Sequence, residues 1–221
     1  MSLKIGDDNK RYLIKWNGFS SKLELLTYDY TTWNATSSQY DMALTNTKVL
    51  SYTTPFLYGY DTTTQTNPTA SIARAMKFNT ITATHSMSVI DNTKIYFEEA
   101  GTYNIQFSAQ LDKEDSGVET DDGFSSLDDV DIWFSKNGQN IPYSNRCFSA
   151  EWLTLHGNNA KTIPSWNFVE SVDVGDYIEI YWSSADTNMR ILTQGTQSSP
   201  NRPAIPSVII TVFQVYTQFI K

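Results

Sequence analysis

The stretch from Tyr103 to Leu111 alternates apolar and polar side chains. Apolar side chains occupy every second position: Tyr103, Ile105, Phe107, Ala109 and Leu111. The positions between them carry Asn, Gln and Ser. Successive side chains of a strand point to opposite sides, so a period of two indicates a strand with one face in a core. The chain must therefore build a sheet that is apolar on one face and polar on the other at this strand.

Most of the chain has the same character. No segment keeps apolar residues at helical spacing, and β-branched and aromatic residues dominate throughout. Turn pairs such as Asn137-Gly138 and Gly175-Asp176 separate short apolar runs. Many short strands joined by tight turns are typical of antiparallel sandwiches. We therefore predict an all-β fold, an antiparallel jelly-roll β-sandwich.

The last apolar run is apolar on both faces. Its two sets of alternate positions are Val208, Ile210 and Val212 on one face, and Ile209, Phe213 and Val215 on the other. Each sheet of a lone sandwich buries only one face, so the second face of this strand needs a cover. Self-association is the favoured prediction, and cover by the N-terminal region is the alternative.

The first 70 residues differ in composition from the rest. Between Leu25 and Thr69 the only basic residue is Lys48, and Thr, Tyr and Asn are abundant, which is typical of polar, extended, loop-rich chain. We predict an attachment region over residues 1–70, made of a β-hairpin and a Thr/Tyr-rich extended segment, and a jelly-roll head over residues 71–221. Aromatic side chains of the first part are predicted to pack against another subunit or to stack on sugars. They are Tyr12, Trp16, Tyr28, Tyr30, Trp33, Tyr40, Tyr58 and Tyr60.

The formal net charge of −8 is concentrated in one segment. Residues 112–131 hold nine acids and one Lys, so the other 15 acids and 15 bases of the chain cancel. No basic arm remains to neutralise phosphates, which argues against nucleic-acid binding.

The chain shows no targeting or membrane pattern. Its first residues lack the apolar run of a signal peptide, and no later run reaches the roughly 20 residues that span a bilayer. The single cysteine, Cys147, excludes an intrachain disulfide. We expect folding in a reducing cytoplasm, with Cys147 packed as a small hydrophobic side chain and no membrane insertion.

The acidic segment is the one candidate metal site. Carboxylate oxygens suit Ca²⁺, and the candidate ligands are Asp121, Asp122, Asp128, Asp129 and Asp131. The spacing does not fit an EF-hand, because its first and third loop positions would be Val118 and Thr120. A solvated surface loop without metal is the favoured interpretation, and no other cofactor is predicted.

Catalytic patterns are weak. The only histidines are His85 and His156, and no Ser lies in a Gly-x-Ser-x-Gly context. Glu98 and Glu99, as neighbours on a strand, would point to opposite faces and could not flank one bond. We predict no catalytic residue and no enzymatic activity.

The order of three motifs resembles a known family. The stretches KIYFEEAGTYNIQFSAQL, DIWFSKNGQNIP and SVDVGDYIEIYW, followed by the closing apolar strand, resemble the globular head of complement C1q and its tumour-necrosis-factor relatives over residues 76–216. The resemblance implies a ten-stranded jelly roll that assembles as a homotrimer around its final strand. The predicted trimer interface then consists of Val208, Ile209, Ile210, Val212, Phe213 and Val215.

Several stretches of the sequence are similar to stretches of such domains in proteins of tailed-bacteriophage particles. Examples are DIWFSKNGQNIP and RPAIPSVIITV. The resemblance implies a virion structural protein, assembled in the bacterial cytoplasm and displayed as a capsid decoration, head fibre or tail-fibre tip. Its N-terminal region would bind other virion proteins, and a host-surface glycan or protein stays open as a further partner. The alternative is a secreted or surface-displayed module that binds carbohydrate or protein.

Overall fold

The chain forms two compact units, residues 1–53 and 54–221. The computed structural model describes the strand backbone of the first unit, and residues 54–114, 129–149 and 161–217 of the second, with side chains to residue 215. All secondary structure in these ranges is β-strand, as predicted. None of the described ranges contains a helix long and apolar enough to cross a bilayer.

The first unit is a four-stranded antiparallel sheet with the order β1-β2-β3-β4. Its strands are β1 (Ser2–Leu3), β2 (Lys10–Asn17), β3 (Lys22–Asn34) and β4 (Gln39–Leu50). The sequence predicts a hairpin here, and β2 and β3 form one. The Thr/Tyr-rich segment, predicted to be loop-rich, is instead mostly strand. Thr and Tyr favour strands even where no apolar alternation marks them.

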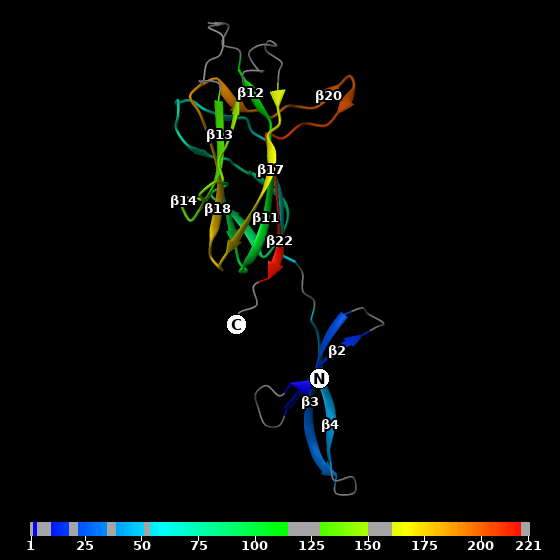
Figure 1. The fold of residues 1–221 in the computed structure, drawn as a ribbon. Helices are drawn as coiled ribbons and strands as arrows, with labels where there is room; N and C mark the ends of the chain where they lie inside the picture. Colours follow the sequence, from blue (N-terminus) through cyan, green and yellow to red (C-terminus); the bar gives the residue numbers. More distant parts are fainter. Residues whose placement is uncertain are drawn as a thin grey trace. The chain divides into compact units, whose positions relative to one another are not determined.

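The second unit is built on two large antiparallel sheets. We call the first the β22 sheet, with the order β17-β11-β22-β5-β8. Its strands are β17 (Ser165–Val172), β11 (Gly101–Ala109), β22 (Val208–Thr217), β5 (Phe56–Asp61) and β8 (Thr80–His85). In Figure 1, β17, β11 and β22 lie side by side in this unit, opposite β13 and β18.

We call the second sheet the β18 sheet, with the order β14-β13-β18-β10-β9. Its strands are β14 (Gln139–Asn140), β13 (Asp129–Lys136), β18 (Tyr177–Ser184), β10 (Lys94–Phe97) and β9 (Met87–Ile90). Two further strands join this sheet: β15 (Arg146–Ser149) pairs with β13, and β7 (Arg74–Ala75) pairs with β18.

Short strands complete the unit. A small sheet has the order β16-β12-β19-β6, and β20 and β21 form a separate hairpin. Their bounds are β16 (Lys161–Thr162), β12 (Leu111–Lys113), β19 (Met189–Ile191), β6 (Gln65–Thr66), β20 (Gln197–Ser198) and β21 (Asn201–Arg202). Ion pairs link three strands of the small sheet. Asp112 on β12 is 2% exposed, and its Oδ2 accepts a hydrogen bond from Arg190 Nε at 2.7 Å. Lys161 Nζ lies 3.5 Å from Asp112 Oδ1.

The core lies between the two large sheets. The predicted inward residues of β11 are all buried, while Asn104, Gln106 and Ser108 face outward. Aromatic rings join the sheets: Phe97 and Tyr103 have ring centroids 4.6 Å apart. Two antiparallel sheets that bury their facing sides with this strand order form a jelly-roll sandwich, so the predicted fold class is confirmed.

The boundary between the units lies at Thr53–Thr54 and not near residue 70. β5 pairs with β22 on one side and with β8 on the other, so it is a central strand of the β22 sheet. Alternate β5 residues, including Leu57, point into the core. The outward positions carry Tyr and Phe, which hides the alternation in the sequence.

Two predicted turns meet at one end of the β18 sheet. Asn137 and Gly138 have φ of 53° and 77°, which suits the tight β13–β14 hairpin. Burial would raise the pKa of the Asp176 carboxyl. Hydrogen bonds from Asn137 Nδ2 (2.7 Å) and the backbone N–H of Asp173 (2.8 Å), together with the nearby Lys136 ammonium, outweigh burial and hold that pKa below its usual value.

Candidate interaction face on the β22 sheet

The strand register arranges the outward side chains of the β22 sheet in rows. Each row crosses β5, β22, β11 and β17, because the four strands pair without interruption at these positions. The three rows are Phe56, Phe213, Asn104 and Val169; Tyr58, Thr211, Gln106 and Asn167; and Tyr60, Ile209, Ser108 and Ser165. We call this surface the β22 face.

The β22 face exposes a large amount of apolar surface. Phe56 and Phe213 are each 37% exposed, Tyr58 is 40% exposed, and Val169 and Val215 are 49% and 50% exposed. Scattered exposed apolar residues are ordinary, but contiguous ones mark interaction sites. Here Phe56 and Phe213 are cross-strand neighbours, Tyr58 and Val215 lie two positions from them along β5 and β22, and Asn104 separates Phe213 from Val169.

The β22 face lacks acidic side chains and the side chains of Lys and Arg. None of the outward positions on the described parts of its five strands is Asp, Glu, Lys or Arg. His85 at the end of β8 is stacked on Phe56, with ring centroids 6.4 Å apart. The outer face of the β18 sheet differs, since it carries Asp131, Lys94 and Glu179. Charge is therefore absent from one side of the sandwich and present on the other.

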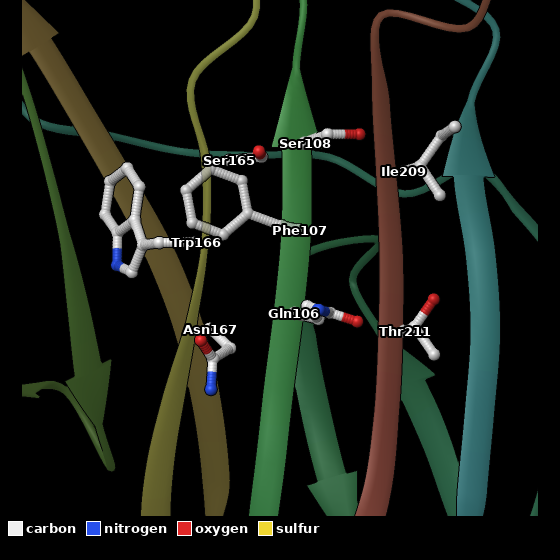
Figure 2. Close-up of a pocket in the computed structure, with 8 residues that line it drawn as sticks. All are labelled: Gln106, Phe107, Ser108, Ser165, Trp166, Asn167, Ile209 and Thr211. Atoms are coloured by element: carbon white, nitrogen blue, oxygen red, sulfur yellow. The ribbon is translucent and has the colours of Figure 1, made fainter.

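A hollow lies between β17, β11 and β22 on this face (Figure 2). Its volume is about 410 Å³. It is lined by Gln106, Phe107, Ser108, Ser165, Trp166, Asn167, Ile209 and Thr211. The outward members are mostly amides and hydroxyls. The hollow can therefore accept neutral groups that both pack and form hydrogen bonds.

Asn104 has an unsatisfied polar atom. It stands between Phe213 and Val169 in the first row, and its Oδ1 is buried with no hydrogen-bond donor among the described residues. A buried acceptor without a donor costs about 1–3 kcal/mol. The β22 face thus combines exposed apolar area with a polar atom that has no partner among the described residues.

The predicted interface strand divides between core and surface. Val208, Ile210 and Val212 point into the sandwich and are 0% exposed, so they belong to the core of their own unit. Ile209, Phe213 and Val215 remain on the β22 face. The structure therefore narrows the predicted interface set to its outward half, because strict alternation leaves the inward half inaccessible to another subunit.

The predicted aromatic contact surface is also divided. Tyr58 and Tyr60 lie on β5 in the jelly-roll unit and belong to the β22 face, not to the attachment region. The other six residues belong to strands of the first unit, and their side chains lie outside the described part of the chain. They are Tyr12, Trp16, Tyr28, Tyr30, Trp33 and Tyr40.

The candidate calcium ligands fall mostly outside the described residues. Asp121, Asp122 and Asp128 lie there, whereas Asp129 and Asp131 are on β13. Asp131 Oδ1 accepts a hydrogen bond from Asn145 Nδ2 at 2.8 Å. In the ranges that the structure covers, no three His, Cys, Asp or Glu side chains come together as metal ligands.

Other singled-out residues have structural surroundings. Glu98 and Glu99 follow the end of β10 and are not on a strand, and Glu99 Oε1 accepts a hydrogen bond from Ser86 Oγ at 2.6 Å. Cys147 is exposed on β15 and does not pack as a core residue, in contrast to the prediction. Partial burial and the neighbouring Asp131 raise the pKa of its thiol. His156 lies outside the described residues.

Sequence reasoning missed several residues of the β22 face. Phe56, Asn167 and Val169 are on it but were not singled out, and Asn104 and Gln106 were predicted only as the polar side of their strand. The sequence does contain one signal, the alternation of positions along a strand: each of these residues occupies an outward position of its strand. Only the pairing of β5 and β17 into this sheet shows that these outward positions meet on one surface.

The chain matches no protein-family model and no curated protein. Solved structures similar to it include the globular domain of a zebrafish complement 1qA protein, at 12% identity and a TM-score of 0.45, covering 75% of this chain and 100% of that one. Murine APRIL is another, at 9% identity and a TM-score of 0.44, covering 74% and 100%. These likenesses concern the fold alone, whose strand order and shared core define an antiparallel jelly roll.

Proposed function

We propose that the protein is a structural component of a tailed-bacteriophage particle. Its role there is binding and display on the particle surface, and not catalysis. The jelly-roll unit assembles as a homotrimer through the β22 face, and the first unit attaches it to other virion proteins. The protein then serves as a capsid decoration, head fibre or tail-fibre tip, for stabilisation or host adhesion. The observation that carries the proposal is the β22 face, which lacks Asp, Glu, Lys and Arg and exposes aromatic and aliphatic side chains.

Burial of this face is favourable because its exposed rings and aliphatic side chains leave water. At about 25 cal/mol per Å², each half-exposed aromatic contributes on the order of 2 kcal/mol when it is fully covered. Neutrality matters as much for self-association. A contact surface without Asp, Glu, Lys or Arg brings no like charges directly together and requires no such ion to be desolvated when identical copies meet. The β22 face meets that condition.

Three-fold display suits a binding role. Three identical heads on one base convert weak single contacts into strong attachment, since later contacts form at a high effective concentration. The separation of the chain into two compact units supports a division between anchor and head. The phage context is supported by the sequence resemblance of the head.

Light scattering tests the assembly. We expect three times the chain mass of 25.1 kDa for the full protein, and three times the mass of the shorter chain for residues 54–221. Monomers in both samples would contradict the trimer. A trimer that is lost on truncation would place the interface in the first unit. If the full protein is a monomer and the truncated protein aggregates and binds a hydrophobic dye, the result would support the alternative that the N-terminal region covers this face.

Immunogold labelling tests the particle. An antibody against residues 54–221 should label regular positions on phage particles produced by the virus that encodes this chain. Label that stays in the lysate and never sediments with intact particles would contradict a virion role.

A further inference from the structure

One tyrosine combines an unfavourable backbone conformation with an almost fully exposed ring. Tyr143 has a φ of 63°, in the left-handed region, and it is 96% exposed. The other non-glycine residues with positive φ in the described ranges are all Ser, Asp or Asn. Short polar side chains tolerate this region, whereas a large side chain there is strained. Because the ring of Tyr143 lies in solvent, it contributes no packing that would offset the strain.

The strain belongs to a tight turn between β14 and β15. The Ser144 backbone N–H donates a hydrogen bond to the Ile141 carbonyl oxygen at 3.3 Å, which closes a four-residue turn. Pro142 occupies the first central position and keeps its φ near −65°. A positive φ at the second central position then corresponds to a type II turn, which favours Gly or Asn there. Tyr143 therefore occupies a position where the turn itself disfavours an aromatic residue.

The residues around Tyr143 hold the turn in place. Ser144 is 2% exposed, and its Oγ accepts a hydrogen bond from the Phe134 backbone N–H at 3.1 Å and donates one to the Ile141 carbonyl oxygen at 2.8 Å. Arg146 Nη1 donates a hydrogen bond to the Tyr143 carbonyl oxygen at 3.3 Å. Phe134 is part of the core, so the turn is tied to the packed interior of the unit. A ring presented on a fixed backbone loses less entropy on binding.

The turn lies at an outer edge of the β18 sheet. β14 and β15 both pair with β13, whose other neighbour is β18, so the connection between them is at the edge of this sheet (Figure 1). The β22 face belongs to the other sheet of the sandwich. Assembly through the β22 face therefore leaves Tyr143 accessible to a further partner.

The shape of the site favours a partner with a pocket. Both faces and the edge of the ring are in water, and only a concave apolar surface covers them together. A sugar stacked on one face would need free polar side chains beside the ring to orient it. Here Asn145 Nδ2 is already bonded to Asp131 Oδ1 at 2.8 Å, and Arg146 Nη1 is bonded to two backbone carbonyl oxygens.

Tyr is among the residue types that most often anchor protein–protein contacts by filling a pocket of the partner. We propose that Tyr143 is the anchor by which the head binds a protein of the host-cell surface, with its ring in an apolar pocket of that protein. This proposal rests on the proposed display of the head on a phage particle. It explains why a strained tyrosine occupies a turn position that suits Gly or Asn.

Flow cytometry with the fluorescently labelled full-length protein tests the anchor, on cells of the bacterium that the encoding virus infects. Tyr143→Asn removes the ring, and its apparent affinity should fall at least about thirtyfold. Tyr143→Phe keeps the ring and should lose less than about tenfold. Val174→Asn is the matched control, since Val174 is 68% exposed in another turn and its φ is not positive. It should bind like wild type.

Thermal unfolding separates binding from folding. Asn tolerates the left-handed region, and no packing is lost with the exposed ring, so Tyr143→Asn should raise the melting temperature by about 2–4 °C. Tyr143→Phe should leave the melting temperature unchanged. A lower melting temperature for Tyr143→Asn would show that the ring serves the fold, and it would overturn the proposal.

Treatment of the cells identifies the kind of partner. Protease should abolish binding, and periodate, which cleaves the vicinal diols of sugars, should leave it intact. Binding lost on periodate treatment would identify a glycan and overturn the protein pocket. Equal binding by wild type and Tyr143→Asn, or no binding of wild type to host cells, would overturn the anchor. Either result would leave the trimer and the virion role standing, because light scattering and immunogold labelling test them separately.

Discussion

Replacing Phe213 by Ala removes the aromatic side chain that β22 contributes to the first row of the β22 face. The ring is 37% exposed in the single subunit, next to the paired Phe56. The substitution therefore removes contact area that only assembly can bury, and it leaves the inward neighbours Val212 and Gln214 in place.

The size of the effect follows from the exposed area. With about 200 Å² for a phenylalanine side chain, the 37% that is exposed amounts to about 75 Å², worth about 2 kcal/mol at about 25 cal/mol per Å². Three subunits lose about 6 kcal/mol together. Because the midpoint of a monomer–trimer equilibrium varies with the square root of the dissociation constant, it should rise by roughly two orders of magnitude.

Sedimentation equilibrium over a wide concentration range measures this midpoint. Ile90→Ala is the matched control, since Ile90 is 45% exposed but lies on β9 of the other sheet. We expect its midpoint to stay within about threefold of wild type. Circular dichroism should show the same strand content for both variants.

Two results would refute the reasoning. One is an unchanged midpoint for Phe213→Ala, which would mean that the β22 face is not buried on assembly. The other is an equal loss of association in Ile90→Ala, which would show that the effect does not depend on the face.

Three further predictions concern stability. Gly59→Ala should lower the free energy of unfolding by about 1–3 kcal/mol in urea titrations, because the new Cβ would meet the Thr80 carbonyl oxygen at 2.9 Å; wild-type stability would contradict the close approach. Arg190→Ala should cost about 1–3 kcal/mol, because the buried Asp112 loses a charged hydrogen-bond donor while Lys161 stays beside it, and Arg190→Lys should partly restore this loss. The lowered pKa of Asp176 contributes stability above its ordinary value of 3.8 that is lost as the pH falls through the lower folded value. Asp176→Asn should therefore be less stable than wild type at pH 6, and urea titrations should show this gap shrinking by pH 3; a gap independent of pH would contradict it.

Alternation predicted the core side of most strands. Tyr103, Ile105 and Phe107 point inward as their spacing indicates, and β22 is apolar on both faces. These features depend on the two-residue period of a strand, which is a local property of the backbone. The tight turns were likewise predictable, since Asn137 and Gly138 readily adopt the positive φ that a hairpin needs.

Strand partners could not be read from local pattern. β5 was assigned to the attachment region because residues 25–69 differ in composition from the rest of the chain, and its own pattern does not name its partner strands. The structure pairs it with β22, about 150 residues later in the chain. Pairing of this kind depends on the whole sheet and on the register between distant strands.

Local patterns in the sequence were enough to predict an antiparallel sandwich and a last strand with no fully polar face. The folded sheets were needed to show that Ile209 and Phe213 are the outward half of that strand, and that Tyr58 and Asn167 share their surface. The alternation of side chains along a strand is a local property of the backbone. The surface of a sheet, in contrast, is formed by strands from distant parts of the chain. The β22 face and its hollow exist only once those strands are in register.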